Sequence, residues 1–146
     1  MVIGLGRFGS ALAQELYNEG HEVMGIDTDE ALVQSCKEFL THAEICSATD
    51  IDTLRQLGVG DVQRAVVAIG SALENSILAT ANLAELGVPE IWAKALTEQH
   101  RRILERIGAH HIVRSPRVTR GGGWRTGSSP RSRSTSSSTG TSCSPR

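Results

Sequence analysis

The feature that most constrains this chain is a glycine-rich run that follows its first apolar residues. Residues 2–9 read Val-Ile-Gly-Leu-Gly-Arg-Phe-Gly, and Asp27 follows Gly9 by 18 positions, at the end of the next apolar stretch. A strand, a glycine turn, a helix, a second strand and an acid in this order predict a βαβ unit that holds the adenosine half of a nucleotide. The alternative interpretation is a plain glycine turn, with an exposed aspartate that caps a helix at residues 27–29.

Each residue of the glycine run has a physical role in the nucleotide interpretation. Gly4 lets the chain turn sharply out of the strand, because a residue without Cβ adopts a positive φ cheaply. Gly6 lets the backbone approach phosphate, and Gly9 lets the helix pack closely on the sheet. The N–H groups of Arg7, Phe8 and Gly9 open that helix, where unpaired donors and the helix dipole attract an anion.

The acid at Asp27 selects among nucleotides. A carboxylate at this position accepts hydrogen bonds from ribose hydroxyl groups and repels a 2′-phosphate. We therefore expect NAD/NADH, ATP or ADP to fit the site and NADP to be disfavoured. Thr28, the next residue, is predicted to belong to the same site.

Short apolar runs alternate with helical patterns between residues 2 and 113. The run Ala65–Ile69 is typical of a parallel strand that is buried on both faces. The pattern predicts strands at 2–5, 22–26, 43–46, 65–69, 91–93 and 110–113. It predicts helices at 7–19, 51–57, 73–86 and 97–107, and a further helix that begins near residue 29. This alternation predicts an α/β fold with a Rossmann-like, doubly wound parallel sheet of about six strands and a ligand at the strands' carboxyl ends.

Charge and composition divide the chain after Val113. Of its 15 Lys and Arg residues, seven lie in residues 114–146, which hold no acid, so residues 1–113 carry eight basic and 16 acidic side chains. This acidic balance argues against nucleic acid as a partner. Residues 114–146 contain ten serines and seven arginines, and such a low-complexity segment cannot bury a core. We expect it to be a disordered tail.

The remaining sequence signals are negative. The three cysteines, Cys36, Cys46 and Cys143, lack metal-ligand spacing, and His110 and His111 lack a third ligand, so no metal site is predicted. Cys36 and Cys46 are expected to be small core or near-core residues in a reducing cytoplasm. No apolar run of about 18 residues and no signal peptide are seen, which predicts that nothing spans a membrane.

Six segments, taken in order, resemble one family. They are Gly-Leu-Gly-Arg-Phe-Gly (4–9), Gly-His-Glu-Val (20–23), Ala-Thr-Asp (48–50), Val-Ala-Ile-Gly (67–70), Ile-Trp-Ala-Lys-Ala (91–95) and Leu-Glu-Arg-Ile-Gly-Ala (104–109). Residues 2–113 thereby resemble the RCK domain (also called KTN or Trk-N), the cytosolic nucleotide-binding regulator of potassium channels and transporters. The resemblance is strongest to Ktr-type regulatory subunits.

The resemblance implies which residues surround the phosphates. Arg7 would reach phosphates, including those bound to a neighbouring subunit, and Lys94 would face the terminal phosphates or the subunit interface. These two cations favour ATP or ADP modestly over NAD. Glu105 would lie where facing subunits meet, near the phosphates and a bound cation. The alternatives are that Lys94 is a solvated strand end and that Glu105 is a surface acid paired with Arg101 or Arg102.

The resemblance also implies which residues surround the base. Ala48 and Thr49 would line the adenine pocket, and Gly70 would allow close approach at the fourth strand. As an alternative, Thr49 or Asp50 is simply a helix N-cap. Many of these domains have Gly-Asp before Ala-Thr, whereas this chain has Cys46-Ser47. A second acidic contact is therefore missing.

The function that the resemblance implies is a non-enzymatic regulatory subunit. Nucleotide exchange would change the geometry between paired subunits and so gate a membrane potassium-translocating subunit. The chain would act in the cytoplasm, at the inner face of the plasma membrane, as a homo-oligomer in a dimer-based ring. The alternative is a fragment of an NAD-dependent oxidoreductase, which would need a substrate domain with a catalytic acid or base. A third alternative is a nucleotide-binding adaptor that works without a transporter.

Two domains are expected, a nucleotide-binding domain at residues 1–113 and the low-complexity Ser/Arg tail at 114–146. In the resembled proteins a dimerisation helix follows the first of these. We hypothesise a frameshift near codon 114 and a start codon placed too late, which would leave a clipped first strand, weak stability and impaired assembly. The hypothesis requires that an alternative reading frame past codon 113 resume helical apolar periodicity.

Overall fold

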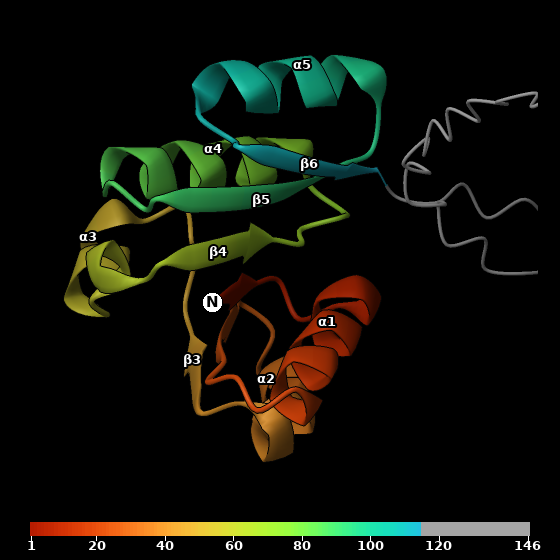
Figure 1. The fold of residues 1–146 in the computed structure, drawn as a ribbon, viewed down its shortest axis with the longest axis vertical. Helices are drawn as coiled ribbons and strands as arrows, with labels where there is room; N and C mark the ends of the chain where they lie inside the picture. Colours follow the sequence, from red (N-terminus) through yellow and green to blue (C-terminus); the bar gives the residue numbers. More distant parts are fainter. Residues whose placement is uncertain (115–146) are drawn as a thin grey trace, which may run out of the picture. The chain divides into compact units, whose positions relative to one another are not determined.

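Six parallel strands form one sheet, in the order β3-β2-β1-β4-β5-β6 (Figure 1). The computed structural model describes residues 1–114. The strands are β1 (Val2–Ile3), β2 (Met24–Asp27), β3 (His42–Ile45), β4 (Arg64–Val67), β5 (Glu90–Ala95) and β6 (His111–Arg114). The helices are α1 (Arg7–Asn18), α2 (Glu30–Cys36), α3 (Ile51–Gln56), α4 (Leu73–Glu85) and α5 (Glu98–Ile107), with 3₁₀ turns η1 (Lys37–Phe39) and η2 (Val59–Asp61). The predicted α/β, Rossmann-like fold is confirmed.

The strand order reverses at β1. Val2 pairs with Gly25 of β2 on one side and with Val66 of β4 on the other, and both ladders are parallel. In an open parallel sheet, ligands bind in the crevice at the carboxyl ends of the strands where the order reverses. The topology therefore places the expected site beyond β1 and β4.

Two separate aliphatic cores lie on the two faces of the sheet. Since strand side chains alternate in direction, Val2 enters one core and Ile3 enters the other. Helices α1 and α2 cover the first face, through Ala13 and Val33 among others. Helices α3, α4 and α5 cover the second face, through residues such as Leu83. Helices on both faces are what makes the sheet doubly wound.

Strands β1 and β4 end two residues earlier than predicted, β2 begins two residues later and β5 ends two residues later. The first strand stops at Ile3, not at residue 5, because Gly4 adopts a left-handed φ of 91°. The fourth strand stops at Val67, although Ala68 still donates its N–H to the Ile3 carbonyl. Both strands thus end early and leave irregular backbone at the crevice.

The predicted tail lies almost entirely outside the described residues. Of residues 114–146, only Arg114 is described, as the last residue of β6. In the part of the chain that the structure covers, no helix has both the length and the apolar character needed to cross a membrane.

Helix α1 starts against the end of β1 without any side chain between them. A Cβ built on Gly9 would lie 1.7 Å from the Gly4 carbonyl oxygen and 3.3 Å from the Ala68 Cβ. The first of these distances is a severe overlap with backbone, which cannot move aside easily. The predicted role of Gly9 in close helix–sheet packing is confirmed.

We expect Gly9→Ala to destabilise the fold by about 3 kcal/mol or more, because the new methyl group forces the helix and the turn apart. The free energy of unfolding in urea measures this loss. Gly6→Ala is the matched control, since among residues 1–114 no atom beyond its two chain neighbours lies within 4 Å of its Cβ position and its φ is −68°. Equal stability of Gly9→Ala and the wild type would contradict the packing argument.

Candidate functional site

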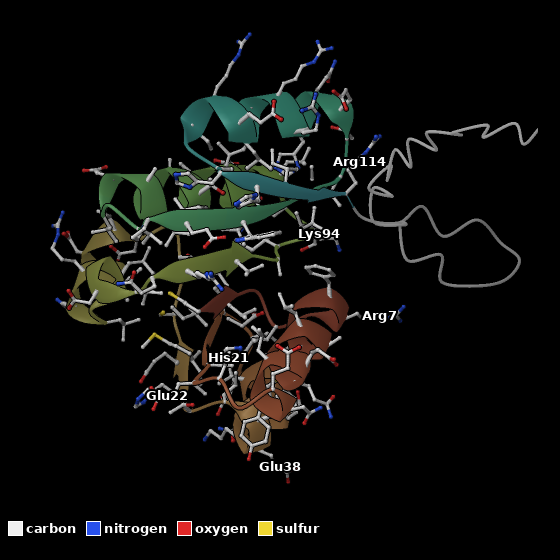
Figure 2. All side chains as sticks on the ribbon, in the orientation of Figure 1. Arg7, His21, Glu22, Glu38, Lys94 and Arg114 are labelled. Carbon is white, nitrogen blue, oxygen red and sulfur yellow. The ribbon has the colours of Figure 1, made fainter. Side chains whose placement is uncertain are left out.

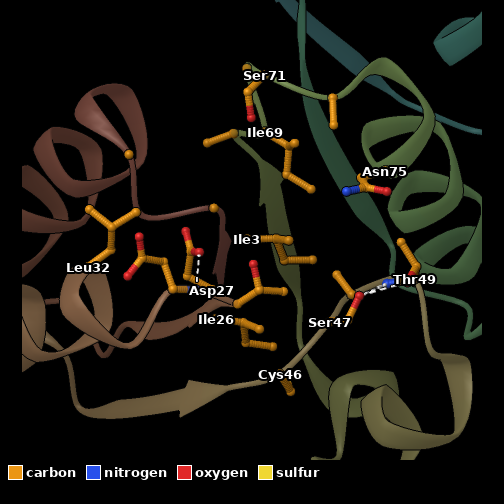
Figure 3. Close-up of a pocket in the computed structure, with 18 residues that line it drawn as sticks. Ile3, Ile26, Asp27, Leu32, Cys46, Ser47, Thr49, Ile69, Ser71 and Asn75 are labelled. Atoms are coloured by element: carbon orange, nitrogen blue, oxygen red, sulfur yellow. Dashed lines mark hydrogen bonds between the residues drawn. The ribbon is translucent and has the colours of Figure 1, made fainter.

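A pocket of about 310 Å³ opens where the first four strands end (Figure 3). The turn after β1, the ends of β2 and β3, the segment after β4 and the start of α4 form its walls. It is lined by Ile3, Gly4, Gly6, Ile26, Asp27, Thr28, Asp29, Leu32, Cys46, Ser47, Ala48, Thr49, Ala68, Ile69, Gly70, Ser71, Ala72 and Asn75. Seven predicted site residues are among them: Gly4, Gly6, Asp27, Thr28, Ala48, Thr49 and Gly70.

Asp27 is held in place by the backbone of two different turns. Its Oδ2 accepts the Leu5 N–H at 2.7 Å, and its Oδ1 accepts the Asp29 N–H at 2.9 Å. An ionised carboxylate has about four acceptor positions, so two remain for a ligand's hydroxyl groups. The helix cap at this point is Asp29, which accepts the Ala31 N–H at 2.9 Å. Asp29 is therefore the helix cap of the alternative interpretation, and Asp27 is the carboxylate of the nucleotide interpretation.

The amino end of α1 has no side-chain cap. Its N-cap residue is Gly6, whereas α2, α3 and α5 are capped by the side chains of Asp29, Asp50 and Thr97. Apart from Gly6 and its two neighbours in the chain, no atom of the described residues lies within 4 Å of the position where a Gly6 Cβ would lie. The first N–H groups of α1 are thus left with open space beside Gly6, a geometry suited to an anion.

The segment after β3 folds into a tight polar turn on the pocket wall. Ser47 Oγ lies 2.7 Å from Thr49 Oγ1 and accepts the Thr49 N–H at 3.3 Å. Asp50 caps α3 by accepting the N–H groups of Asp52 and Thr53, and hydrogen bonds from Thr53 lower the pKa of its carboxyl group. Asp50 is therefore the N-cap, and Thr49 is left on the pocket wall.

Five predicted site residues do not line the pocket. They are Arg7, Phe8, Gly9, Lys94 and Glu105. Gly9 packs behind the turn, against Gly4. The Arg7 side chain is exposed and projects away from the sheet (Figure 2). These positions do not form part of the cavity wall, although Phe8 and Lys94 lie close to its rim.

Lys94 is placed beside the pocket by an aromatic ring. Its Nζ lies 5.2 Å from the centroid of the Phe8 ring, within the range of a cation–π interaction. The same atom is 3.4 Å from the position where a Cβ of Gly70 would lie. Among residues 1–114 no carboxylate forms an ion pair with Lys94. The Phe8 ring holds the ammonium group in place, and no described acid neutralises its charge.

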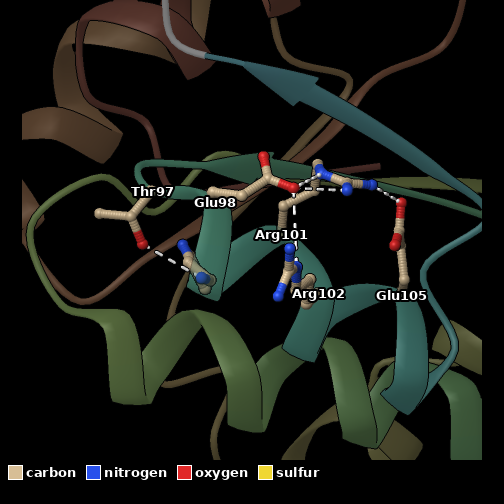
Figure 4. Close-up of polar contacts among 6 residues, drawn as sticks. Thr97, Glu98, Arg101, Arg102 and Glu105 are labelled. Carbon is tan, nitrogen blue, oxygen red and sulfur yellow. Dashed lines mark hydrogen bonds and ion pairs between the residues drawn. The ribbon is translucent and has the colours of Figure 1, made fainter.

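Glu105 belongs to an ion-pair cluster on α5 (Figure 4). Arg101 pairs with both Glu98 and Glu105, and Arg102 approaches Glu98 at 3.8 Å. These interactions lower the pKa of Glu98, first through its hydrogen bond from Arg101. Within the single chain, Glu105 is the surface acid paired with Arg101 that the alternative interpretation describes.

Over the described residues, no group of three or more His, Cys, Asp or Glu side chains could hold a metal ion.

Sequence reasoning missed several residues of the pocket wall. Ser71 and Asn75 come from the segment after β4 and the first turn of α4, and Cys46 and Ser47 precede the predicted Ala48. Asn75 was detectable in principle, because it is a polar residue in the first turn of a helix that follows a buried strand. Cys46 and Ser47 carried a weaker signal, because they stand where many members of the resembled family have Gly-Asp before Ala-Thr.

Burial raises the pKa of the Cys46 thiol, and the nearby acids Glu44 and Asp50 raise it further. We therefore expect Cys46 to react slowly with maleimide at pH 7 and faster as the pH rises, with a midpoint above that of an ordinary cysteine. Mass spectrometry of the labelled peptide measures the rate.

Cys36 is 1% exposed and should stay unlabelled in the native protein. Cys143, outside the described residues, is replaced by Ser for this assay. Rapid labelling of Cys46 at pH 7 would contradict the raised pKa.

The chain is similar in sequence and in fold to known proteins. The TrkA-N domain family matches residues 1–115. The chain is 43% identical over 112 residues to Ktr system potassium uptake protein A of Bacillus subtilis, covering 77% of this chain and 50% of that protein. It is 44% identical over 116 residues to Ktr system potassium uptake protein C of the same organism, covering 80% and 52%. The chain thus spans about half the length of these relatives.

Solved structures share the fold at lower identity. The GsuK channel bound to NAD superposes with a TM-score of 0.66 at 17% identity, covering 77% of this chain and 20% of that one. GsuK bound to ADP gives the same TM-score and identity, with 77% and 30% covered.

Proposed function

The chain belongs to the TrkA-N domain family, and on that premise we propose that it is a nucleotide-sensing regulatory domain of a potassium-uptake system. The proposed sensing unit is residues 1–113, and the proposed ligand is an adenine nucleotide, ATP/ADP or NAD/NADH. The relatives that carry the name Ktr potassium uptake protein support the system. GsuK, which has the same fold, has been solved with NAD and with ADP.

The observation that carries the proposal is the meeting of Asp27 and the open glycine turn in one pocket. The free acceptor positions of Asp27 suit ribose hydroxyl groups, and the uncapped N–H groups that follow Gly6 suit a phosphate. Both contacts are available without rearrangement, because Asp27 is already fixed by Leu5 and Asp29. We assign Gly4, Gly6, Asp27, Thr28, Ala48, Thr49 and Gly70 to this ligand.

Charge favours a nucleotide with its phosphates at the rim of the pocket. The Lys94 ammonium group, held over Phe8, is near the segment at Gly70. An ammonium group that no acid among residues 1–114 neutralises gains more from a terminal phosphate than from a neutral nicotinamide. This favours ATP or ADP over NAD. Arg7 and Glu105, which lie away from this pocket, are assigned to contacts with neighbouring copies of the chain.

The proposed output is a shift between two arrangements of paired copies. A nucleotide moves such an equilibrium only if it binds one arrangement more tightly than the other. A membrane potassium-translocating subunit would read the change, with the domain at the cytoplasmic face of the membrane. We propose a non-enzymatic role, since the only titratable side chains on the described pocket wall are Asp27, Asp29 and Cys46. An NAD-dependent oxidoreductase fragment is the second candidate.

We expect ADP to stabilise the protein against heat and Asp27→Asn to weaken ADP binding about 10-fold or more, because a charge-assisted hydrogen bond to ribose is lost. Isothermal titration calorimetry gives the affinity, and NADP should bind more weakly than NAD to the wild type. Glu44→Gln removes an exposed carboxylate outside the pocket and should bind ADP normally. Unchanged ADP affinity in Asp27→Asn would refute the ribose assignment.

We expect Lys94→Met to weaken ATP binding about 5-fold and AMP binding much less, since the lost charge faces the outer phosphates. Titrations at low and moderate salt check this, and the difference between wild type and variant should shrink as salt rises. Lys37→Met, an exposed lysine on η1, is the matched control. Equal losses for ATP and AMP would place Lys94 away from the phosphates.

A further inference from the structure

Asn82, on α4 and outside the pocket wall, forms an unusual link to the turn that lines it. Its Nδ2 donates to the Ala48 carbonyl oxygen at 3.0 Å, across 34 positions of sequence. The other side-chain hydrogen bonds of the segment 46–50 are local. They join Ser47 to Thr49, or are donated by the first residues of α3 to the Asp50 carboxylate. Among the described residues, the hydrogen bond from the Asn82 amide is therefore the one side-chain hydrogen bond that joins this turn to α4.

The helix is built to make this contact. Asn75, Ala79 and Asn82 follow the i, i+4, i+7 spacing of one helix face. Asn75 lines the pocket, and Ala79 is fully buried in the core that also contains Ala48. The small side chain at Ala79 allows the helix to approach the turn, so that Asn82 reaches the Ala48 carbonyl two turns beyond Asn75.

Holding one carbonyl fixes the direction of the next N–H. The Ala48–Thr49 peptide bond is trans, as all described peptide bonds are, so its carbonyl and N–H groups point in opposite directions. With the carbonyl held by Asn82, the Thr49 N–H turns away from α4 and toward Ser47 Oγ, which lines the pocket. The same bond thereby sets where the polar groups of Ser47 and Thr49 face.

We propose that Asn82 is a positioning residue for base recognition: its amide holds the Ala48–Thr49 peptide plane so that Ser47 and Thr49 present their polar groups to the base of the bound nucleotide. This inference rests on the proposed function. Asn82 acts through Ala48 and does not touch the ligand. It should therefore affect discrimination between bases, and not contacts to ribose or phosphate.

The test compares ADP with CDP, which share the ribose and diphosphate and differ in the base, on the full 146-residue chain by calorimetry. We expect Asn82→Ala to weaken ADP binding about 5- to 10-fold and to leave CDP binding unchanged, as for the loss of one ordinary hydrogen bond in the site. Asn82→Asp keeps the volume without the donor and should match Asn82→Ala. Asn82→Gln keeps the amide donor and should recover part of the ADP preference.

Thr80→Val is the matched control. The buried Thr80 hydroxyl donates to the Ser76 carbonyl at 2.8 Å within α4, so this change weakens the helix without touching the turn. It should lower the melting temperature and leave the ratio of ADP to CDP affinity unchanged. Equal losses for ADP and CDP in the Asn82 variants, no loss at all, or unfolding of both Asn82→Ala and Asn82→Asp would overturn the proposal. Failure of the wild type to bind any adenine nucleotide would instead refute the proposed function.

Discussion

The contact between Gly9 and the Gly4 carbonyl is the constraint from which the pocket follows. Because there is no Cβ at position 9, α1 begins directly against the end of β1. The amino end of the helix then comes to the point where the strand order reverses, with Gly6 as an uncapped N-cap. Any side chain at Gly9 would push this end away and separate the helix donors from the other walls of the crevice.

Asp27 joins the separate parts of that crevice. It is the last residue of β2, yet its carboxylate accepts an N–H from the turn after β1 and another from the start of the α2 segment. Such bonds use acceptors that would otherwise need water, and they leave the carboxylate oriented before a ligand arrives. The Asn82 bond does the same for the turn after β3. Side chains thus fix three neighbouring turns that regular strand pairing does not reach.

Much of the fold and part of the site could be predicted from sequence for local physical reasons. The run Ala65–Ile69 is a buried strand wherever it lies, and glycine at position 4 permits a conformation that other residues resist. The glycine turn followed by an acid along the sequence predicted that Gly6 and Asp27 lie in one pocket, and both line it. Asn75 and Ser71 were not found. Asn75 carried the weak signal of a polar residue in the first turn of a helix that follows a buried strand, but which of these residues reach the pocket wall depends on how α4 packs.

The sequence by itself determined the class of the fold, the glycine turn and the acid at Asp27. Hydrophobic periodicity, the backbone freedom of glycine and side-chain charge are properties of short segments. Only the tertiary structure decided which polar residues share a pocket. It separated the cap at Asp29 from the free acceptor at Asp27, and it placed Thr49 on the pocket wall with Asp50 as the cap. It also paired Glu105 with Arg101 and held Lys94 over Phe8. Such choices depend on distances between segments that are far apart in the chain, which packing sets and sequence spacing does not.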